Sequence, residues 1–177
     1  HGPQQTALAV ALLGNGQLQV LARGTVNLQG ILMRQPLGFL DEASGRVNDL
    51  CFNRLGTALA IGNEDQTVEF AELEQLSYKF PFRTIMRQHP VHLNSPVNFA
   101  RFLSDDRSVV CGLNDGNLAI VDSSNGRLIW QEKLAAQGID AMCVSHNGKQ
   151  IAFDDHLNNI YTADIQMQPA VRIVHSK

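Results

Sequence analysis

The stretch Val97–Trp130, VNFARFLSDDRSVVCGLNDGNLAIVDSSNGRLIW, decides the fold because it holds four short apolar runs separated by three turns. The turns are marked by polar and glycine residues at Ser104–Asp106, Asn114–Gly116 and Ser123–Gly126. Short β-forming runs that are interrupted by such turn residues indicate an antiparallel meander. We therefore predict four antiparallel strands in this stretch.

The same pattern recurs on both sides of this stretch. Each copy opens with an apolar residue, and the key positions follow at intervals of 5, 7, 6, 3 and 4 residues. The three copies open 50 and then 42 residues apart. Their aligned positions are Val47, Phe52, Leu59, Asp65, Val68, Glu72; Val97, Phe102, Val109, Asp115, Leu118, Asp122; and Ile139, Val144, Ile151, Leu157, Ile160, Asp164. A period of about 40–50 residues with four strands per copy is typical of β-propeller blades.

The start of the chain fits only the later part of the repeat. Ala9 takes the place of Val109, and Asn15–Val20 overlays Asp115–Ile120. We therefore predict second, third and fourth strands there, the fourth at Arg23–Met33, but no first strand. The predicted blades, within a single domain covering 1–177, are a partial one at 6–34 and complete ones at 45–86, 95–134 and 137–176.

The predicted fold class is all-β, with about four propeller blades of four antiparallel strands. Runs such as Val109–Cys111 and Leu118–Val121 are apolar on both faces, which suits blades that cover one another. Closed propellers have about four to eight blades. An open array would expose apolar faces and sheet edges, so we expect this segment to belong to a larger or jointly completed ring.

The complete copies resemble the WD40 repeat family in the segments VNDLCFNRLGTALAIGNEDQTVEFAEL, VNFARFLSDDRSVVCGLNDGNLAIVD and IDAMCVSHNGKQIAFDDHLNNIYTAD. Asp65 and Asp115 match the structural Asp of the turn before the third strand in that family. Glu72, Asp122 and Asp164 match the Asp of the family's Trp-Asp pair. The resemblance implies a propeller with a partner-binding face.

The sequence departs from the family pattern at several positions. Ala71, Val121 and Ala163 replace the Trp, Leu157 replaces the turn Asp, and no Gly-His precedes a blade. We therefore expect most of the family's hydrogen-bond network to be missing. One blade, Asp115–Trp130, is also similar to the repeat of quinoprotein-type propellers, which have Asp-Gly before a strand and Gly and Trp after it.

Composition narrows the classes of function. The chain has 177 residues, 44% hydrophobic and 18% charged, with a net charge of −3, which does not favour a nucleic-acid or anionic-membrane surface. Its longest apolar runs, such as Leu8–Leu13, are too short to cross a bilayer. Cys51, Cys111 and Cys143 are odd in number and form no CxxC pair, so we expect free thiols inside the cell. Because the chain starts at His1, we expect it to be processed or excised from a longer chain.

Two connections between copies are about eight residues longer than the third, and the surplus lies around Arg34–Ser44 and Arg87–Pro96. Loops on a rigid scaffold often carry function, and both links fall on the face that meets partners in the resembling propellers. The predicted partner-binding residues are Arg34, Phe39, Arg87, His89, His92 and Asn94.

The other polar side chains of the sequence do not predict a catalytic or metal-binding site. His89 and His92 lack further metal ligands nearby in sequence, and Asp154–His156 falls on a predicted turn. Cys51 and Cys143 occupy equivalent positions without a poised base. We predict no catalytic, cofactor or metal site.

The predicted function is that of a non-enzymatic scaffold for protein–protein interaction, acting as a subunit or domain of a larger assembly. One alternative is a quinoprotein-like or other enzymatic propeller with a site in the central channel. Another is a sensor propeller that binds a peptide in that channel. These readings rest on fold analogy, and a fold does not imply a function.

Overall fold

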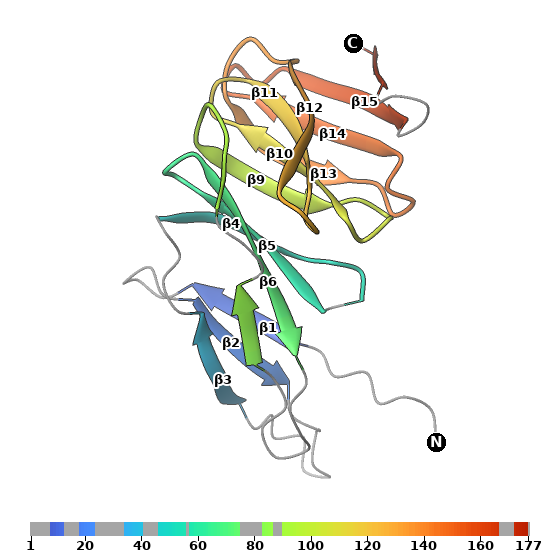
Figure 1. Cartoon of the computed structure of the whole chain (residues 1–177). Helices are drawn as coiled ribbons and strands as arrows, with labels where there is room; N and C mark the ends of the chain where they lie inside the picture. The colour runs from blue at the N-terminus through green and yellow to red at the C-terminus, as the bar shows by residue number, and fades with distance from the viewer. Residues whose placement is uncertain are drawn as a thin grey trace.

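The computed structural model describes residues 8–12, 18–23, 34–40, 46–55, 57–74, 83–86, 90–166 and 172–176, and the side chains of 46–55, 57–72 and 90–166. The described residues form antiparallel strands and no helix, which confirms the all-β prediction. Among these residues there is accordingly no helix with the length and apolar character needed to span a membrane. The strands build four sheets that follow one another along the chain (Figure 1).

Each sheet is a meander in which strands adjacent in sequence pair with each other, except that β8 pairs with β6 and not with β7. The first sheet contains β1 (Leu8–Leu12), β2 (Leu18–Arg23) and β3 (Arg34–Leu40). The second contains β4 (Val47–Phe52), β5 (Ala58–Asn63), β6 (Thr67–Glu74), β7 (Arg83–Met86) and the short β8 (Val91–His92). The third contains β9 (Val97–Phe102), β10 (Ser108–Leu113), β11 (Asn117–Asp122) and β12 (Arg127–Lys133). The fourth contains β13 (Ile139–Val144), β14 (Gln150–Asp155), β15 (Ile160–Gln166) and β16 (Arg172–Ser176).

The pairing register repeats from sheet to sheet at the positions that the sequence intervals predict. Aligned residues of the first and second strands pair as Phe52 with Leu59, Phe102 with Val109, and Val144 with Ile151. Aligned residues of the second and third strands pair as Leu59 with Ala71, Val109 with Val121, and Ile151 with Ala163. In the first sheet Ala9 pairs with Leu21, as its alignment with Val109 predicts. The sequence repeat is therefore a structural repeat.

The first sheet has three strands, equivalent to the second, third and fourth strands of the other copies. Its last strand is β3 at Arg34–Leu40, so the prediction of a loop beginning at Arg34 is wrong. Apart from Arg23, which ends β2, the predicted strand at Arg23–Met33 lies outside the described residues. Pro36 and Gly38 are residue types common in loops, so the sequence pattern does not predict β3. The register between β2 and β3 shifts there, with Val20 opposite Gly38 and Leu21 opposite Pro36. An edge strand with a bulge tolerates Pro because that residue does not have to donate to the ladder.

The second long connection also contains a strand. β8 pairs with β6 through Val91 opposite Val68 and His92 opposite Thr67, beyond the segment of β6 that pairs with β7. β7 and β8 together therefore correspond to the single strand β12 of the third sheet. The prediction that Arg87–Pro96 is wholly a loop is wrong, because part of the surplus is inserted within the fourth strand rather than after it.

The sheets stack face to face. One apolar cluster joins the second and third sheets and includes Val68 and Phe70 from β6 and Val109 and Cys111 from β10. Another joins the third and fourth sheets and includes Ile120 and Leu118 from β11 and Ile151 and Phe153 from β14. The first strands β4, β9 and β13 contact one another in succession, and β3 of the first sheet lies beside β7 of the second. Figure 1 shows the order, from the blue first sheet at one end to the red fourth sheet at the other.

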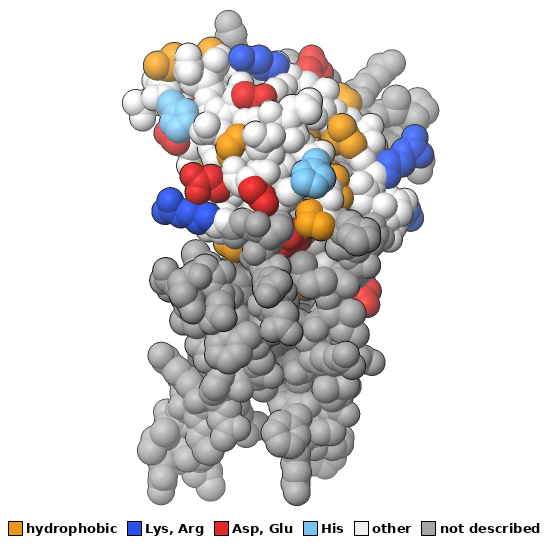
Figure 2. All heavy atoms as spheres, turned by 60° about the vertical axis from the view of Figure 1, so that its left-hand side comes forward, with side chains coloured by type: hydrophobic (Ala, Val, Ile, Leu, Met, Phe, Trp, Pro, Cys, Tyr) orange, Lys and Arg blue, Asp and Glu red, His pale blue; other side chains and the backbone are white. Residues whose placement is uncertain are grey.

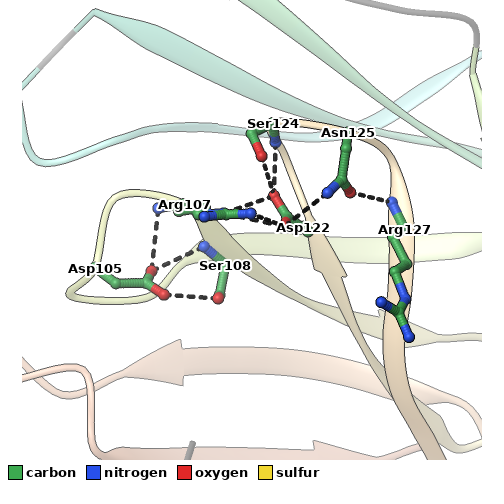
Figure 3. A network of polar contacts seen from close by, with 7 residues as sticks. All are labelled: Asp105, Arg107, Ser108, Asp122, Ser124, Asn125 and Arg127. Atoms are coloured by element: carbon green, nitrogen blue, oxygen red, sulfur yellow. Dashed lines mark hydrogen bonds and ion pairs between the residues drawn. The ribbon is translucent and has the colours of Figure 1, made fainter.

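The turns of the third sheet are held by two aspartates (Figure 3). Asp122 is buried and accepts hydrogen bonds from Ser124 N at 2.9 Å, Ser124 Oγ at 2.6 Å and Asn125 Nδ2 at 3.1 Å. It also pairs with Arg107 at 2.5 Å, and this hydrogen bond holds the pKa of the Asp122 carboxyl well below its usual range. Asp105 accepts from Ser108 N at 2.8 Å and fixes the preceding turn. At the position of the family's Trp-Asp aspartate, this chain therefore has a local network of its own.

The hairpin between the second and third strands uses an aspartate in each complete copy. Asp65 accepts from Thr67 N at 3.2 Å, and Asp115 accepts from Asn117 N at 3.1 Å, as expected for Asp at this turn. In the fourth sheet Leu157 stands at that position, and Asp155, two residues earlier, accepts from Leu157 N and Asn159 N, both at 3.0 Å. Burial raises the pKa of Asp155, but these hydrogen bonds outweigh it and the net pKa is lowered.

Candidate binding surfaces

Of the six predicted partner-binding residues, the structure describes the side chains of His92 and Asn94 only. Arg34 and Phe39 lie in the strand β3, and their side chains lie outside the described set, as do Arg87 and His89 altogether. His92 at the end of β8 and Asn94 after it are exposed. Figure 2 shows one side of the molecule, where the described apolar, basic and acidic side chains form small separate groups.

The second and third sheets each contact the next sheet through an asparagine at the same aligned position. Asn48 and Asn98 are the extra residues of a bulge in the first strand, and a bulge turns a side chain away from its usual direction. Asn48 Nδ2 donates to the carbonyl oxygen of Val97 at 3.2 Å, and Asn98 Nδ2 donates to that of Ile139 at 2.9 Å. The second sheet is thus hydrogen-bonded to the first residue of the third sheet, and the third sheet to the first residue of the fourth.

A glycine makes room for that opening residue. A Cβ on Gly62 would lie 2.8 Å from Val97 Cγ1, and one on Gly112 would lie 3.0 Å from Ile139 Cγ2. Gly62 and Gly112 are aligned positions in the second strands of their sheets. The close approach of the two sheets therefore requires a residue without a side chain.

The fourth sheet has aspartates at both positions. Asp140 is the extra residue of the bulge in β13, where Asn48 and Asn98 stand in the earlier sheets. Asp154 in β14 takes the place of the two glycines and pairs with Ala141 on one side and Ile160 on the other. Ile160 is 76% exposed, whereas the aligned Val68 and Leu118 are fully buried. The face that is covered in the second and third sheets is thus open in the fourth, and we call it the open face.

Part of the open face, towards the turn between β13 and β14, is a shallow hollow of about 330 Å³. It is lined by Cys143, Ala152 and Thr162, which pair across β13, β14 and β15, and by residues next to them. In the third sheet the residue aligned with Thr162 is Ile120, which is fully buried. Because Thr162 stands where the third sheet has Ile120, this face is more polar than its counterpart. Cys143 and Ala152 still give the hollow an apolar base.

The carboxylates of the open face are differently partnered. Asp140 Oδ1 lies 2.9 Å from His156 Nδ1, and both side chains are about half exposed. Asp164 accepts a hydrogen bond from Gln150 Nε2 at 2.9 Å. Oδ1 of Asp154 is shielded from solvent and accepts no hydrogen bond from the described residues. An unsatisfied acceptor of this kind costs free energy.

A second cavity of about 340 Å³ lies where β4, β9 and β13 end. Its lining repeats with the fold, because aligned residues of three sheets contribute to it: Cys51, Arg101 and Cys143; Phe52, Phe102 and Val144; Arg54, Ser104 and His146. The turns around it are in contact, since Arg54 N donates to Asp106 Oδ1 at 2.7 Å and a Cβ on Gly148 would lie 2.5 Å from Ser104 Cβ. We call it the strand-end cavity.

The charges of the strand-end cavity are largely paired within the chain. Arg101 pairs with Asp49, whose carboxylate also accepts from Ala100 N at 2.9 Å. Arg54 Nε lies 3.7 Å from Asp106 Oδ2. Burial raises the pKa of the Cys51 thiol, so this cysteine is not an activated thiolate at neutral pH.

The remaining sequence candidates have structural roles. Asp155 holds its hairpin, and His156 pairs with Asp140, so Asp154–His156 is not one convergent group. Within the described part of the chain, no three His, Cys, Asp or Glu side chains are grouped so as to hold a metal ion. Cys51, Cys111 and Cys143 carry free thiols, and burial raises the pKa of Cys111 to about 12.

Sequence reasoning missed both the open face and the strand-end cavity because it searched the long connections. The signal for the open face was present in the alignment of the copies. Asn48 and Asn98 align with Asp140, and Gly62 and Gly112 align with Asp154. The fourth sheet is the copy in which both of these positions are Asp, and its face is the one that is not covered by another described sheet of this chain.

Comparison with known proteins adds no family to this geometry: no family model matches the sequence, and a search of curated proteins gives no significant match.

Proposed function

We propose that this chain is a segment of a WD40-like β-propeller that acts as a non-enzymatic scaffold for protein–protein interaction within a larger assembly. The open face carries the proposal, because the equivalent face of the second and third sheets is buried against another sheet. An exposed apolar residue such as Ile160, beside a hollow on a regular sheet, suits a protein partner. The free thiols suit a reducing compartment inside the cell.

The propeller part of the proposal rests on the order of the strands. In a propeller the first strand of each blade lies next to the central axis, and β4, β9 and β13 contact one another in that sequence. The aligned registers and the repeated sheet-to-sheet contacts support the same arrangement. A solution structure of the chain together with its partner would show whether a ring closes.

The experiment is a partner search followed by a measured affinity. The chain is immobilised and exposed to extract from its source, a stoichiometric partner is identified by mass spectrometry, and the purified partner is titrated calorimetrically. Ile160→Asp on the open face is expected to weaken binding at least about tenfold, as for a contact near an interface centre. Leu55→Asp, at a similarly exposed residue in the turn after β4, is the matched control. If no partner binds the purified chain, or if it copurifies with a chromophoric cofactor, the proposal is overturned.

The strand-end cavity supports a second candidate, the recognition of a short peptide. Its lining comes from three aligned strands, and it presents the side chains of Arg54, Arg101 and His146 over an apolar floor. In the same titrations Arg54→Ala would then weaken binding, whereas Ile160→Asp would not. The two candidates therefore predict opposite outcomes for one pair of variants.

A further inference from the structure

The open face differs from the two covered faces in the two positions that make the contact between sheets. Asn48 and Asn98 donate hydrogen bonds to the next sheet, whereas Asp140 has no proton to donate when it is ionised. Gly62 and Gly112 leave space for a β-branched residue, whereas Asp154 occupies that space with a carboxymethyl group. Both changes replace a neutral group with an acceptor that carries negative charge.

These changes exclude a sheet of the kind found inside this chain. A strand seated as Ile139 is seated on the third sheet would bring its carbonyl oxygen to Asp140, where Asn98 Nδ2 lies 2.9 Å from it. Its first side chain would meet Asp154, where even a Cβ on Gly112 would lie 3.0 Å from Ile139 Cγ2. Two oxygens without a proton between them repel each other, and the side chains would overlap.

What the open face can accept follows from its chemistry. Asp154 is partly exposed, and Asp140 is about half exposed with one histidine contact. Between them and the hollow, Ile160 and Ala152 offer apolar surface. A cationic side chain beside an apolar one satisfies both features.

We propose that the open face binds an extended segment of a partner protein, which places a Lys or Arg side chain against Asp140 and Asp154 and an apolar side chain over the hollow at Ala152 and Thr162. The inference rests on the proposed interaction function and names the chemistry of the partner. A second copy of this face is a poor occupant, because Asp140, Asp154 and Asp164 would meet the same carboxylates.

The test uses two acetylated, amidated peptides, VRVRV and VEVEV, titrated into the isotopically labelled chain and followed by the shifts of its backbone amide signals. At about 50 mM salt VRVRV is expected to bind at least about tenfold more tightly than VEVEV, since opposite charge favours one and like charge rejects the other. The shifts are expected on β13, β14 and β15, including Ala152 and Thr162. Shifts confined to the strand-end cavity around Arg54 and His146, or no preference between the peptides, would overturn the proposal.

Charge variants separate the named carboxylates from the net charge of the chain. Asp140→Asn with Asp154→Asn is expected to weaken VRVRV binding about threefold to tenfold, as for the loss of two partly exposed ion pairs. Glu64→Gln with Glu132→Gln removes the same charge at two exposed sites elsewhere and is expected to leave binding within about twofold. Equal losses in both variants would mean that only the overall charge matters and would overturn the inference.

This outcome can be told apart from failure of the proposed function. If the natural partner binds and Ile160→Asp abolishes binding, but the peptides show no preference, the open face is used without the cation and only this inference fails. If no partner binds at all, the proposed function fails. Thermal unfolding of each variant confirms that the sheet is intact.

Discussion

The third and fourth sheets pair their first three strands in the same register but have opposite surroundings. Ile120 and Thr162 occupy aligned positions, yet Ile120 is fully buried between sheets and Thr162 is exposed. Gly112 leaves room for Ile139 of the next sheet, whereas its counterpart in the fourth sheet is Asp154, which carries a side chain. The comparison teaches that strand pairing and sheet stacking are separate properties of a repeat, and that a few side chains decide the second without altering the first.

The largest effect is expected from transferring the fourth sheet's residue to the third. Gly112→Asp places a side chain where a Cβ would already lie 3.0 Å from Ile139 Cγ2, and adds an unpaired charge to a buried interface. We expect a loss of about 3–5 kcal/mol in the free energy of unfolding. Asp154→Gly, the reverse change, should alter it by less than about 1 kcal/mol. Urea unfolding of both variants tests this, and similar losses would mean that the two faces are equally covered.

A somewhat smaller effect is expected from shortening the side chains at the centre of the two faces. Ile120→Ala opens a cavity between the third and fourth sheets and should cost about 2–5 kcal/mol. Thr162→Ala, at the aligned exposed position, should change the free energy of unfolding by about 0.5 kcal/mol or less. Denaturant midpoints with unchanged slopes would report both values. A loss at Thr162 comparable to that at Ile120 would show that the open face is covered in the isolated chain.

Asp122 and Asp164 are aligned, but only Asp122 is buried in a network, so they should differ in their dependence on pH. Because the folded pKa of Asp122 is depressed, its stabilising contribution is present above the unfolded value of about 3.9 and is lost as pH falls towards the folded pKa. Asp122→Asn should cost about 1–3 kcal/mol at pH 7 through weakened hydrogen bonds to a charged group. It should also flatten the fall in stability below about pH 4.

The matched control for that experiment is Asp164→Asn. Asp164 is exposed and accepts a hydrogen bond from Gln150, so its replacement should cost less than that of Asp122 at neutral pH. Urea midpoints between pH 7 and pH 3 measure both series. An unchanged acid profile for Asp122→Asn would contradict the assigned role of its pairing with Arg107.

The smallest effect is expected at the edge of the open face. His156 and Asp140 are about half exposed, and such pairs contribute about 0.2–1 kcal/mol. His156→Ala should therefore reduce the free energy of unfolding by no more than that amount, and a double-mutant cycle with Asp140→Ala isolates the pair. A coupling well above 1 kcal/mol would mean that the pair is part of a buried contact rather than an exposed one.

Much of the fold followed from the sequence because strand pairing here is local. A hairpin fixes its own register through the length and residues of its turn, so the intervals between apolar residues predicted which residues pair, including Ala9 with Leu21. The prediction was wrong where a strand contains loop-type residues, as at Pro36 and Gly38 in β3. It was also wrong where a strand is interrupted, as between β7 and β8.

The candidate site was less predictable than the fold. Long connections drew attention to Arg34, Phe39, Arg87, His89, His92 and Asn94. The open face instead lies on regular strands, and its residues look ordinary in sequence because Asp, Thr and Ile are all tolerated there. Only their alignment with the Asn and Gly residues of the sheet-to-sheet contacts, and with buried apolar residues, in two other sheets distinguishes them.

The sequence by itself determined that the chain is all-β, where most of its strands begin, and in which register they pair, since each of these depends on residues within one hairpin. Only the tertiary structure decided which faces are buried, because burial depends on side chains brought together from aligned copies about 40–50 residues apart. Ile120 and Thr162 obey the same local pattern. One meets Ile151 and its neighbours across an interface, whereas the other faces the hollow that we assign to a partner.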